Sequence, residues 1–195
     1  MSREVVLAFL PADSSLLQRS YLNWAAARIA PSRQKKRYGA PGQAPMVHAE
    51  IWLKENDNDG FAASICYNKT CHYARKRFSR KTWSFRSIYV SEAQFKKLQL
   101  FFSAHKGCKF NKVGFFALGL AGLRISGKWP ERLGWRPRFW CSELIVTGLK
   151  AVGYFEKSGP GAISTQCHPE ELFQFVGIIS SASTIRDWAQ DEVAY

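Results

Sequence analysis

The spacing of apolar residues in the first part of the chain predicts a strand followed by a helix. Residues 5–10 form a short apolar run, which is typical of a buried strand. Asp13 or Ser14 can cap a helix whose apolar side continues to about Ala30, and Pro31 then ends it.

Strict alternation over residues 46–53 predicts a second strand with two different faces. One face is apolar and carries Val47, Ala49, Ile51 and Leu53. The other face carries His48, Glu50 and Trp52. The turn signal at residues 56–60 then predicts a hairpin that leads into a third strand at residues 61–67.

The middle of the chain continues this mixture of strands and helices. Residues 83–90 alternate and predict a further strand. Ser91 and Gln94 have the spacing of a capping box for a helix that runs to about residue 104. A second helix is predicted to begin at Cys141 and to stop at Gly153.

The last part of the chain predicts one short helix and one strand. Pro169 suits the first turn of a helix, with Glu170 and Glu171 near its positive end. Residues 175–179 form an apolar run that predicts a strand. The aromatic segment 129–140 either borders a substrate groove or is a packed connection.

Composition limits the class of protein. A chain of 195 residues with 46% hydrophobic content forms one globular domain or at most two small ones. The formal net charge of +13 favours an anionic partner, either nucleic acid, a lipid surface or an acidic protein. The longest apolar run, residues 113–123, is too short to cross a bilayer.

The cysteines indicate a reducing environment. Five cysteines are an odd number, and the apolar run near residue 5 is shorter than a secretory signal usually needs. We therefore expect free thiols and an intracellular, cytoplasmic location.

Cys141 is the candidate nucleophile because it lies at the start of a helix and on its inward stripe. The unpaired backbone N–H groups of a helix N-terminus favour a thiolate and can also hold an oxyanion. We expect Cys141 to be the one strongly reactive thiol of the chain. The alternative is that Cys141 is a small buried hydrophobic residue, as most core cysteines are.

His48 is the candidate general base, and Glu50 is the candidate group that orients it. Side chains two apart on a strand share a face, so the carboxylate can reach the imidazole. The alternative is an edge strand with a solvated polar face.

Two possible metal sites and two basic segments are the remaining candidates, and the sequence argues against both metal sites. The turn at residues 56–60 lacks the later glutamate of a calcium loop. Zinc binding would need the following residues, whose spacing does not match a zinc finger: Cys66, Cys71, His72, Cys167 and His168. Residues 32–45 and 69–81 are basic and are predicted to be exposed loops that can contact phosphates.

The order of the motifs resembles the circularly permuted NlpC-type papain-like proteins, which occur in bacteria and in large DNA viruses. The resemblance covers roughly residues 47–175. It rests on H-A-E at residues 48–50 and W-C-S-E-L at residues 140–144, together with F-A-A-S-I-C, W-S-F, S-E-A-Q and H-P-E-E-L. As in the permuted group, the histidine precedes the cysteine.

This resemblance implies an α+β fold, with a single permuted papain-like domain over residues 1–195 and a central antiparallel sheet packed against helices. It implies Cys141 as nucleophile, His48 as base and Glu50 as the third residue, with Ser64 as the alternative third residue. It implies no cofactor. Relatives cleave peptides or isopeptides, hydrolyse thioesters or lipid esters, or transfer acyl chains.

Three functions therefore remain open at the level of the sequence. The first is a thiol-dependent hydrolase of the peptidase, amidase or thioesterase type that works through an acyl-enzyme. The second is an acyltransferase or lipid-ester hydrolase at a membrane. The third is a non-enzymatic basic protein that binds nucleic acid, packaged in a virion if the source is viral.

Overall fold

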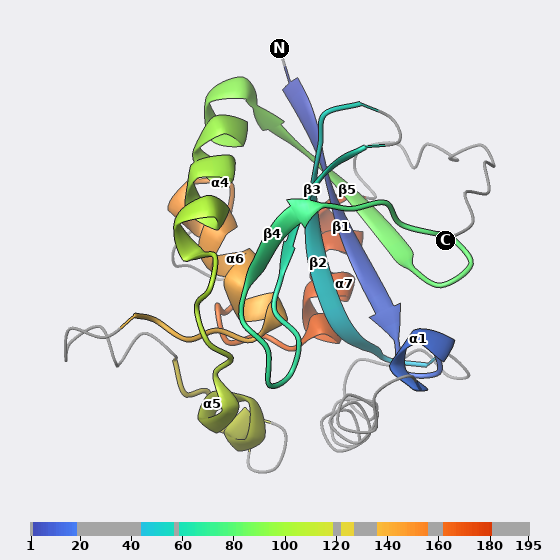
Figure 1. The fold of residues 1–195 in the computed structure, drawn as a ribbon, viewed down its shortest axis with the longest axis vertical. Coiled ribbons are helices and arrows are strands. Elements are labelled where there is room, and N and C mark those ends of the chain that lie inside the picture. Colours follow the sequence, from blue (N-terminus) through green and yellow to red (C-terminus); the bar gives the residue numbers. More distant parts are fainter. Residues whose placement is uncertain are drawn as a thin grey trace.

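The computed structural model describes residues 2–18, 44–56, 59–118, 122–126, 136–155 and 162–180. Five antiparallel strands form one sheet in the order β4-β3-β2-β1-β5 (Figure 1). The strands are β1 (Ser2–Pro11), β2 (Met46–Lys54), β3 (Gly60–Ser64), β4 (His72–Arg75) and β5 (Ser84–Ser91). With the helices described below, this arrangement is an α+β fold.

Strand β1 lies between β2 and β5 and pairs with both over most of its length. Its residues 5–10 are all buried, which explains why the sequence shows an unbroken apolar run there. The predicted strands at residues 5–10, 46–53 and 83–90 are confirmed. The predicted hairpin is confirmed as β2–β3, although β3 ends at Ser64 and does not continue to residue 67.

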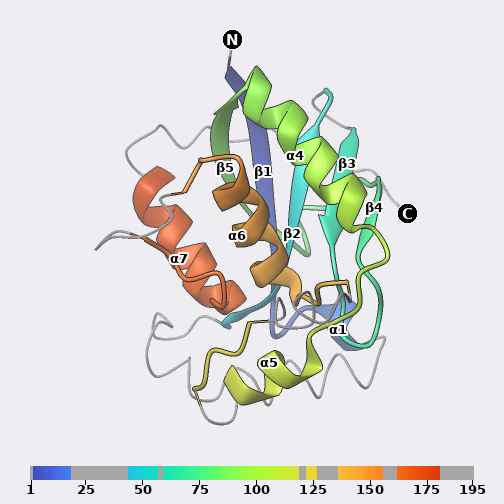
Figure 2. The same ribbon diagram turned by 90° about the vertical axis from the view of Figure 1, so that its left-hand side faces the viewer.

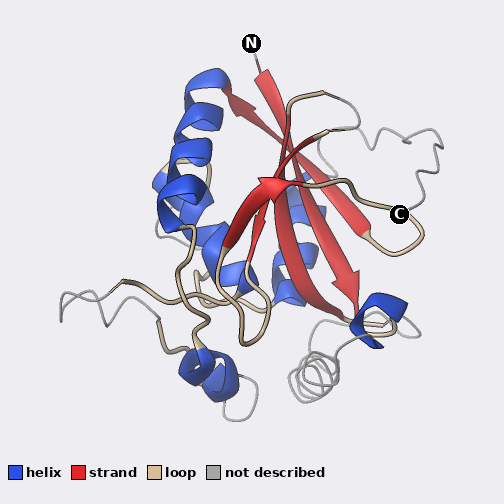
Figure 3. Ribbon diagram, in the orientation of Figure 1, coloured by secondary structure: helices blue, strands red, loops and turns tan. Residues whose placement is uncertain are grey.

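Three helices cover one face of the sheet (Figures 2 and 3). They are α4 (Glu92–His105), α6 (Cys141–Ala151) and α7 (Pro169–Ser180). Two shorter helices, α1 (Ser15–Gln18) and α5 (Lys112–Phe116), lie outside this layer. The main hydrophobic core fills the space between the sheet and the three covering helices. Burial of apolar surface in this layer is the main force that holds the helices in place.

The ends of α4 and α6 follow the sequence signals. Gln94 N–H donates to Ser91 Oγ at 3.2 Å, and Ser91 N–H donates to Gln94 Oε1 at 2.9 Å, so the predicted capping box is confirmed. Gly153 has a φ of +72°, a left-handed conformation that stops α6 at little cost for glycine.

Helix α6 is more deeply enclosed than an amphipathic surface helix. All residues from Cys141 to Leu149 are buried, including the polar Glu143 and Thr147. The helix contacts α4, α7, β2 and β3, and these neighbours leave it no solvent-facing side along those residues. Its first residue is therefore held inside the protein.

The opposite face of the sheet carries two smaller apolar clusters. Trp83 packs there with Ala8 and Leu10, and Trp52 packs with Val6 and Ala62. Val47 joins the Trp83 cluster, so the prediction that Val47 shares a face with Ala49, Ile51 and Leu53 is wrong. The β1–β2 register shifts between Leu10 and Pro11, and this irregularity interrupts the alternation at the start of β2.

Two further predictions are wrong. Residues 175–179 belong to helix α7, because Leu172 and Val176 repeat at helical spacing and are both fully buried. Residues 69–81 are not a simple loop, since they contain β4, where Arg75 forms ion pairs with Glu55 and Asp59. Of the helix predicted for residues 13–30, only Ser15–Gln18 falls within the described residues, and most of the basic segment 32–45 lies outside them.

Candidate active site

The start of α6 is fixed by a segment that lies later in the chain. Ser142 Oγ donates to the carbonyl oxygen of Cys167 at 2.6 Å, and the Trp140 indole N–H donates to the same oxygen at 3.1 Å. Trp140 N–H donates to Glu143 Oε2 at 3.4 Å. Cys141, which is 4% exposed, is thus held between two residues with fixed side chains. Trp140 is itself buried, and residues 129–135 of the aromatic segment lie outside the described residues.

The segment that holds α6 also holds β2. Glu170 lies in the first turn of α7, and its Oε2 accepts a hydrogen bond from Met46 N–H at 2.6 Å. Met46 comes two residues before His48. The segment at residues 167–170 therefore positions both the start of the cysteine helix and the start of the histidine strand.

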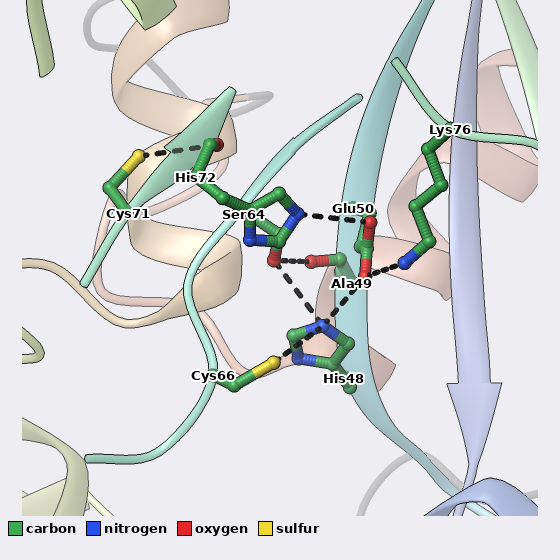
Figure 4. A network of polar contacts seen from close by, with 8 residues as sticks. All are labelled: His48, Ala49, Glu50, Ser64, Cys66, Cys71, His72 and Lys76. Carbon is green, nitrogen blue, oxygen red and sulfur yellow. Dashed lines mark hydrogen bonds and ion pairs between the residues drawn. The ribbon is translucent and has the colours of Figure 1, made fainter. Parts of the chain in front are cut away.

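The His48 imidazole lies within a cluster of polar side chains (Figure 4). Its Nε2 is 3.3 Å from Glu50 Oε1, 3.3 Å from Ser64 Oγ and 3.8 Å from Cys66 Sγ. The ring also makes an edge contact with Trp83, with ring centroids 6.1 Å apart. The His48 ring is therefore held in one orientation by partners from β2, from β3 and from the segment that follows β3.

Glu50 is a buried carboxylate that lies beside one lysine and two histidines. Lys76 Nζ donates to Glu50 Oε1 at 2.7 Å, and His72 Nε2 lies 3.5 Å from Glu50 Oε2. Burial alone would raise the pKa of Glu50, but hydrogen bonds from His48 and His72 and the charge of Lys76 hold that pKa well below its usual range. Glu50 is therefore a carboxylate at neutral pH and can hold the imidazole, as the sequence predicts.

Ser64, the alternative third residue, contacts the same imidazole nitrogen. Its hydroxyl donates to the Ala49 carbonyl oxygen at 2.6 Å, so its oxygen is left to accept from His48 Nε2. Glu50 and Ser64 are both fully enclosed and both contact the ring. They form one joint support for His48.

Cys66 is a second thiol beside His48, although the sequence suggested it only as a possible zinc ligand. Burial raises the pKa of the Cys66 thiol, but the charge and hydrogen bond of His48 outweigh this effect and lower the pKa below its ordinary value. Cys66 lies two positions after Ser64, just beyond the end of β3. In the predicted strand 61–67, this spacing places Cys66 on the same face as Ser64, and it was the signal that could have revealed Cys66 as a neighbour of His48.

The thiols in turn act on His48. Burial alone would lower the pKa of His48, but the negative charge of Cys66 and Cys141 as thiolates raises it well above its ordinary value of 6.5. The imidazole is therefore charged when a neighbouring thiol has lost its proton. This is the electrostatic arrangement of a thiolate–imidazolium pair.

His48, Glu50, Cys66 and Cys141 line one cavity of about 210 Å³. Most of its other walls are apolar and come from several separate parts of the chain: Leu10, Leu16, Val47, Ile65, Tyr67, Trp83, Phe110 and Phe115. The cavity therefore combines a reactive polar centre with an apolar surface that can accept a carbon chain or an aromatic ring.

The structure brings Cys141, His48 and Glu50 together at this cavity, whereas their catalytic roles remain a prediction. The residues of the zinc hypothesis are not brought together. No group of three or more His, Cys, Asp or Glu side chains among the described residues is arranged to hold a metal ion. Cys71 is buried beside Cys108, and burial raises its pKa to about 12.

None of the five cysteines, all of which lie in the described ranges, forms a disulfide. Within the described ranges, no helix combines the length and apolar character that a membrane span needs. Comparison of the chain with protein-family models, with curated proteins and with solved structures finds no match.

Proposed function

We propose that this protein is a thiol-dependent hydrolase of the permuted papain-like type, with Cys141 as nucleophile, His48 as general base and Glu50 as the residue that orients His48. The observation that carries the proposal is the His48 imidazole, which contacts a buried carboxylate and shares one cavity with a thiol at a helix N-terminus. A nucleophile, a base and a group that orients the base are the parts that covalent acyl transfer requires.

The reaction would begin when His48 takes the proton of the Cys141 thiol. The thiolate attacks the carbonyl carbon of the substrate, and the carbonyl oxygen becomes an oxyanion. The backbone N–H groups in the first turn of α6 precede the first helical hydrogen bond, from Leu144 N–H to the Trp140 carbonyl, and are suited to hold that oxyanion.

The tetrahedral intermediate then collapses as the bond to the leaving group breaks. The His48 imidazolium gives its proton to the departing amine, alcohol or thiol, and a thioester remains on Cys141. Neutral His48 next takes a proton from water, the hydroxide attacks the thioester, and the acid leaves as the thiolate is restored. With an alcohol or amine in place of water, the same steps transfer the acyl group.

The cavity favours an acyl group with an apolar side. Tyr67, Phe110 and Phe115 belong to one aromatic cluster that reaches the cavity wall, while Trp83 lies near His48. Burial of an apolar chain against these rings contributes about 25 cal/mol for each Å² removed from water. We therefore expect apolar acyl esters and thioesters to react faster than short polar ones.

The test is formation of an acyl-enzyme with p-nitrophenyl esters of acetate, butyrate and octanoate. Intact-protein mass spectrometry should find one acyl adduct, and peptide mapping should place it on Cys141. Cys141→Ala and His48→Gln should each lower release of p-nitrophenol by at least about 100-fold. Cys108→Ala, a buried thiol away from the cavity, is the matched control and should keep the wild-type rate.

Two outcomes would refute the proposal. One is an adduct that forms equally well in Cys141→Ala. The other is a rate that is unchanged in His48→Gln while the circular dichroism spectrum stays that of the wild type. Addition of hydroxylamine as acceptor, with measurement of the hydroxamate, distinguishes hydrolysis from acyl transfer.

A further inference from the structure

Lys76 lies just after β4 and reaches into the candidate site (Figure 4). Its ammonium donates to Glu50 Oε1 at 2.7 Å. The same nitrogen lies 4.8 Å from the centre of the Phe78 ring and 5.0 Å from the centre of the Trp83 ring. One carboxylate oxygen and two aromatic faces therefore hold the lysine head at a fixed place, and the side chain forms part of the cavity wall.

The oxygen that Lys76 occupies is the oxygen that His48 uses. His48 Nε2 lies 3.3 Å from Glu50 Oε1, so both nitrogens contact a single atom. The distance between His48 Nε2 and Lys76 Nζ therefore cannot exceed the sum of these two contact distances. At this separation, in a partly buried site, one positive charge acts strongly on the protonation of the other group.

The other titratable groups around His48 and Glu50 come from four parts of the fold. Glu50 lies on β2 beside it, Cys66 follows β3, and Cys141 begins α6. His72, on β4, contacts the second oxygen of Glu50 at 3.5 Å. Among the described groups that contact Glu50 Oε1, Lys76 is the one that brings an ammonium group.

We infer that Lys76 is a positioning residue that sets how strongly Glu50 holds the protonated His48 imidazole. Its ammonium competes with His48 for Glu50 Oε1 and repels the imidazolium. It therefore limits the stability of the imidazolium and keeps His48 able to exchange its proton. The catalytic consequence rests on the proposed function, whereas the effect on His48 protonation does not.

Loss of the Lys76 charge should make His48 hold its proton more tightly. Lys76→Met keeps a long apolar side chain between the two rings but removes the ammonium. The His48 titration midpoint should then move to higher pH by about one unit. Lys76→Arg keeps a positive charge and should leave the midpoint close to that of the wild type.

The experiment is a pH titration of the full chain followed by NMR of ¹³C-labelled histidine. The protein has four histidines, and the signal of His48 is identified by its absence in His48→Gln. Lys97→Met is the matched control, because Lys97 is an exposed lysine on α4 away from the cavity. The control should titrate like the wild type. A thermal melt of each variant verifies that it is folded.

The inference is overturned if folded Lys76→Met leaves the His48 midpoint unchanged, if it moves the midpoint to lower pH, or if Lys97→Met produces the same shift. Should Lys76→Met fail to fold, Lys76→Gln also removes the positive charge but ends in a polar amide. The same criterion applies to that variant. The titration needs no substrate. If the His48 midpoint shifts in Lys76→Met but the protein has no esterase activity, the role of Lys76 stands and only the proposed function is refuted.

Discussion

His168 should make the protein sensitive to acid. Its side chain is 3% exposed, and its Nδ1 accepts a hydrogen bond from Glu170 N–H at 3.3 Å in the first turn of α7. Its Nε2 is buried without a hydrogen-bond partner. Burial lowers the pKa of His168 from 6.5 to about 3, because a charged imidazole there would lose its hydration and gain no counter-charge.

The sign and size of the effect follow from proton linkage. The unfolded chain takes up a proton at this residue near pH 6.5, while the folded protein takes it up only near pH 3. Stability from His168 is therefore fully present above pH 6.5 and is lost as the pH falls toward 3. The loss is about 2 kcal/mol between pH 6.5 and 4.5 and about 4 kcal/mol by pH 3.

Between pH 6.5 and 4.5 the change in stability due to His168 can be separated from the effects of His48 and Glu50. The folded pKa of His48 lies above 6.5, so the stability that His48 contributes is constant below that pH. The folded pKa of Glu50 lies well below its ordinary 4.5, so Glu50 adds its own loss of stability only below about that pH.

Urea unfolding at half-unit steps from pH 7 to 4.5 measures the free energy of unfolding. His168→Asn keeps an acceptor for the Glu170 N–H and removes the titrating group, so the loss on acidification should shrink by about 2 kcal/mol relative to the wild type. Leu172→Val in the adjacent helix α7 is the control. It should lower stability by about 1 kcal/mol at every pH. If wild type and His168→Asn lose stability in parallel, His168 is not the buried neutral group described above.

Other measurements test the site, the packing and the surface. Iodoacetamide at neutral pH should label Cys141 and Cys66 before the other three cysteines, since both lie beside His48, and equal labelling of all five in peptide maps would contradict this. Gly148→Ala should cost about 1–3 kcal/mol in urea unfolding, because its Cβ would lie 2.9 Å from the Phe102 ring. The basic segment 32–45 should bind heparin with an affinity that falls steeply with added NaCl, and a salt-insensitive complex would be the opposite result.

The sequence patterns that predicted correctly were local ones. Alternation placed His48 and Glu50 close enough for contact, and the helix start placed Cys141 inside the protein. The capping box at Ser91 and the left-handed glycine at Gly153 marked helix ends, because a few neighbouring residues decide each of these features.

The features that the sequence did not reveal depend on contacts between distant segments. Cys66 and Lys76 meet His48 and Glu50 only through the β2–β3–β4 pairing, and β4 is four residues long within a basic run that has no strand pattern. Residues 175–179 have a composition that suits either strand or helix. Packing of α7 on β2 and β5 decides between the two.

The hydrogen bonds of residues 167–170 have a consequence during protein synthesis. His48 and Cys141 leave the ribosome before this segment does, so a nascent chain can contain both residues while it still lacks the Cys167 carbonyl and the Glu170 carboxylate that hold α6 and β2 in place. At that stage the segments that carry Cys141 and His48 lack the hydrogen bonds that fix them in the folded protein. A growing chain that has not yet made α7 therefore lacks the contacts that position His48 and Cys141 in the finished cavity.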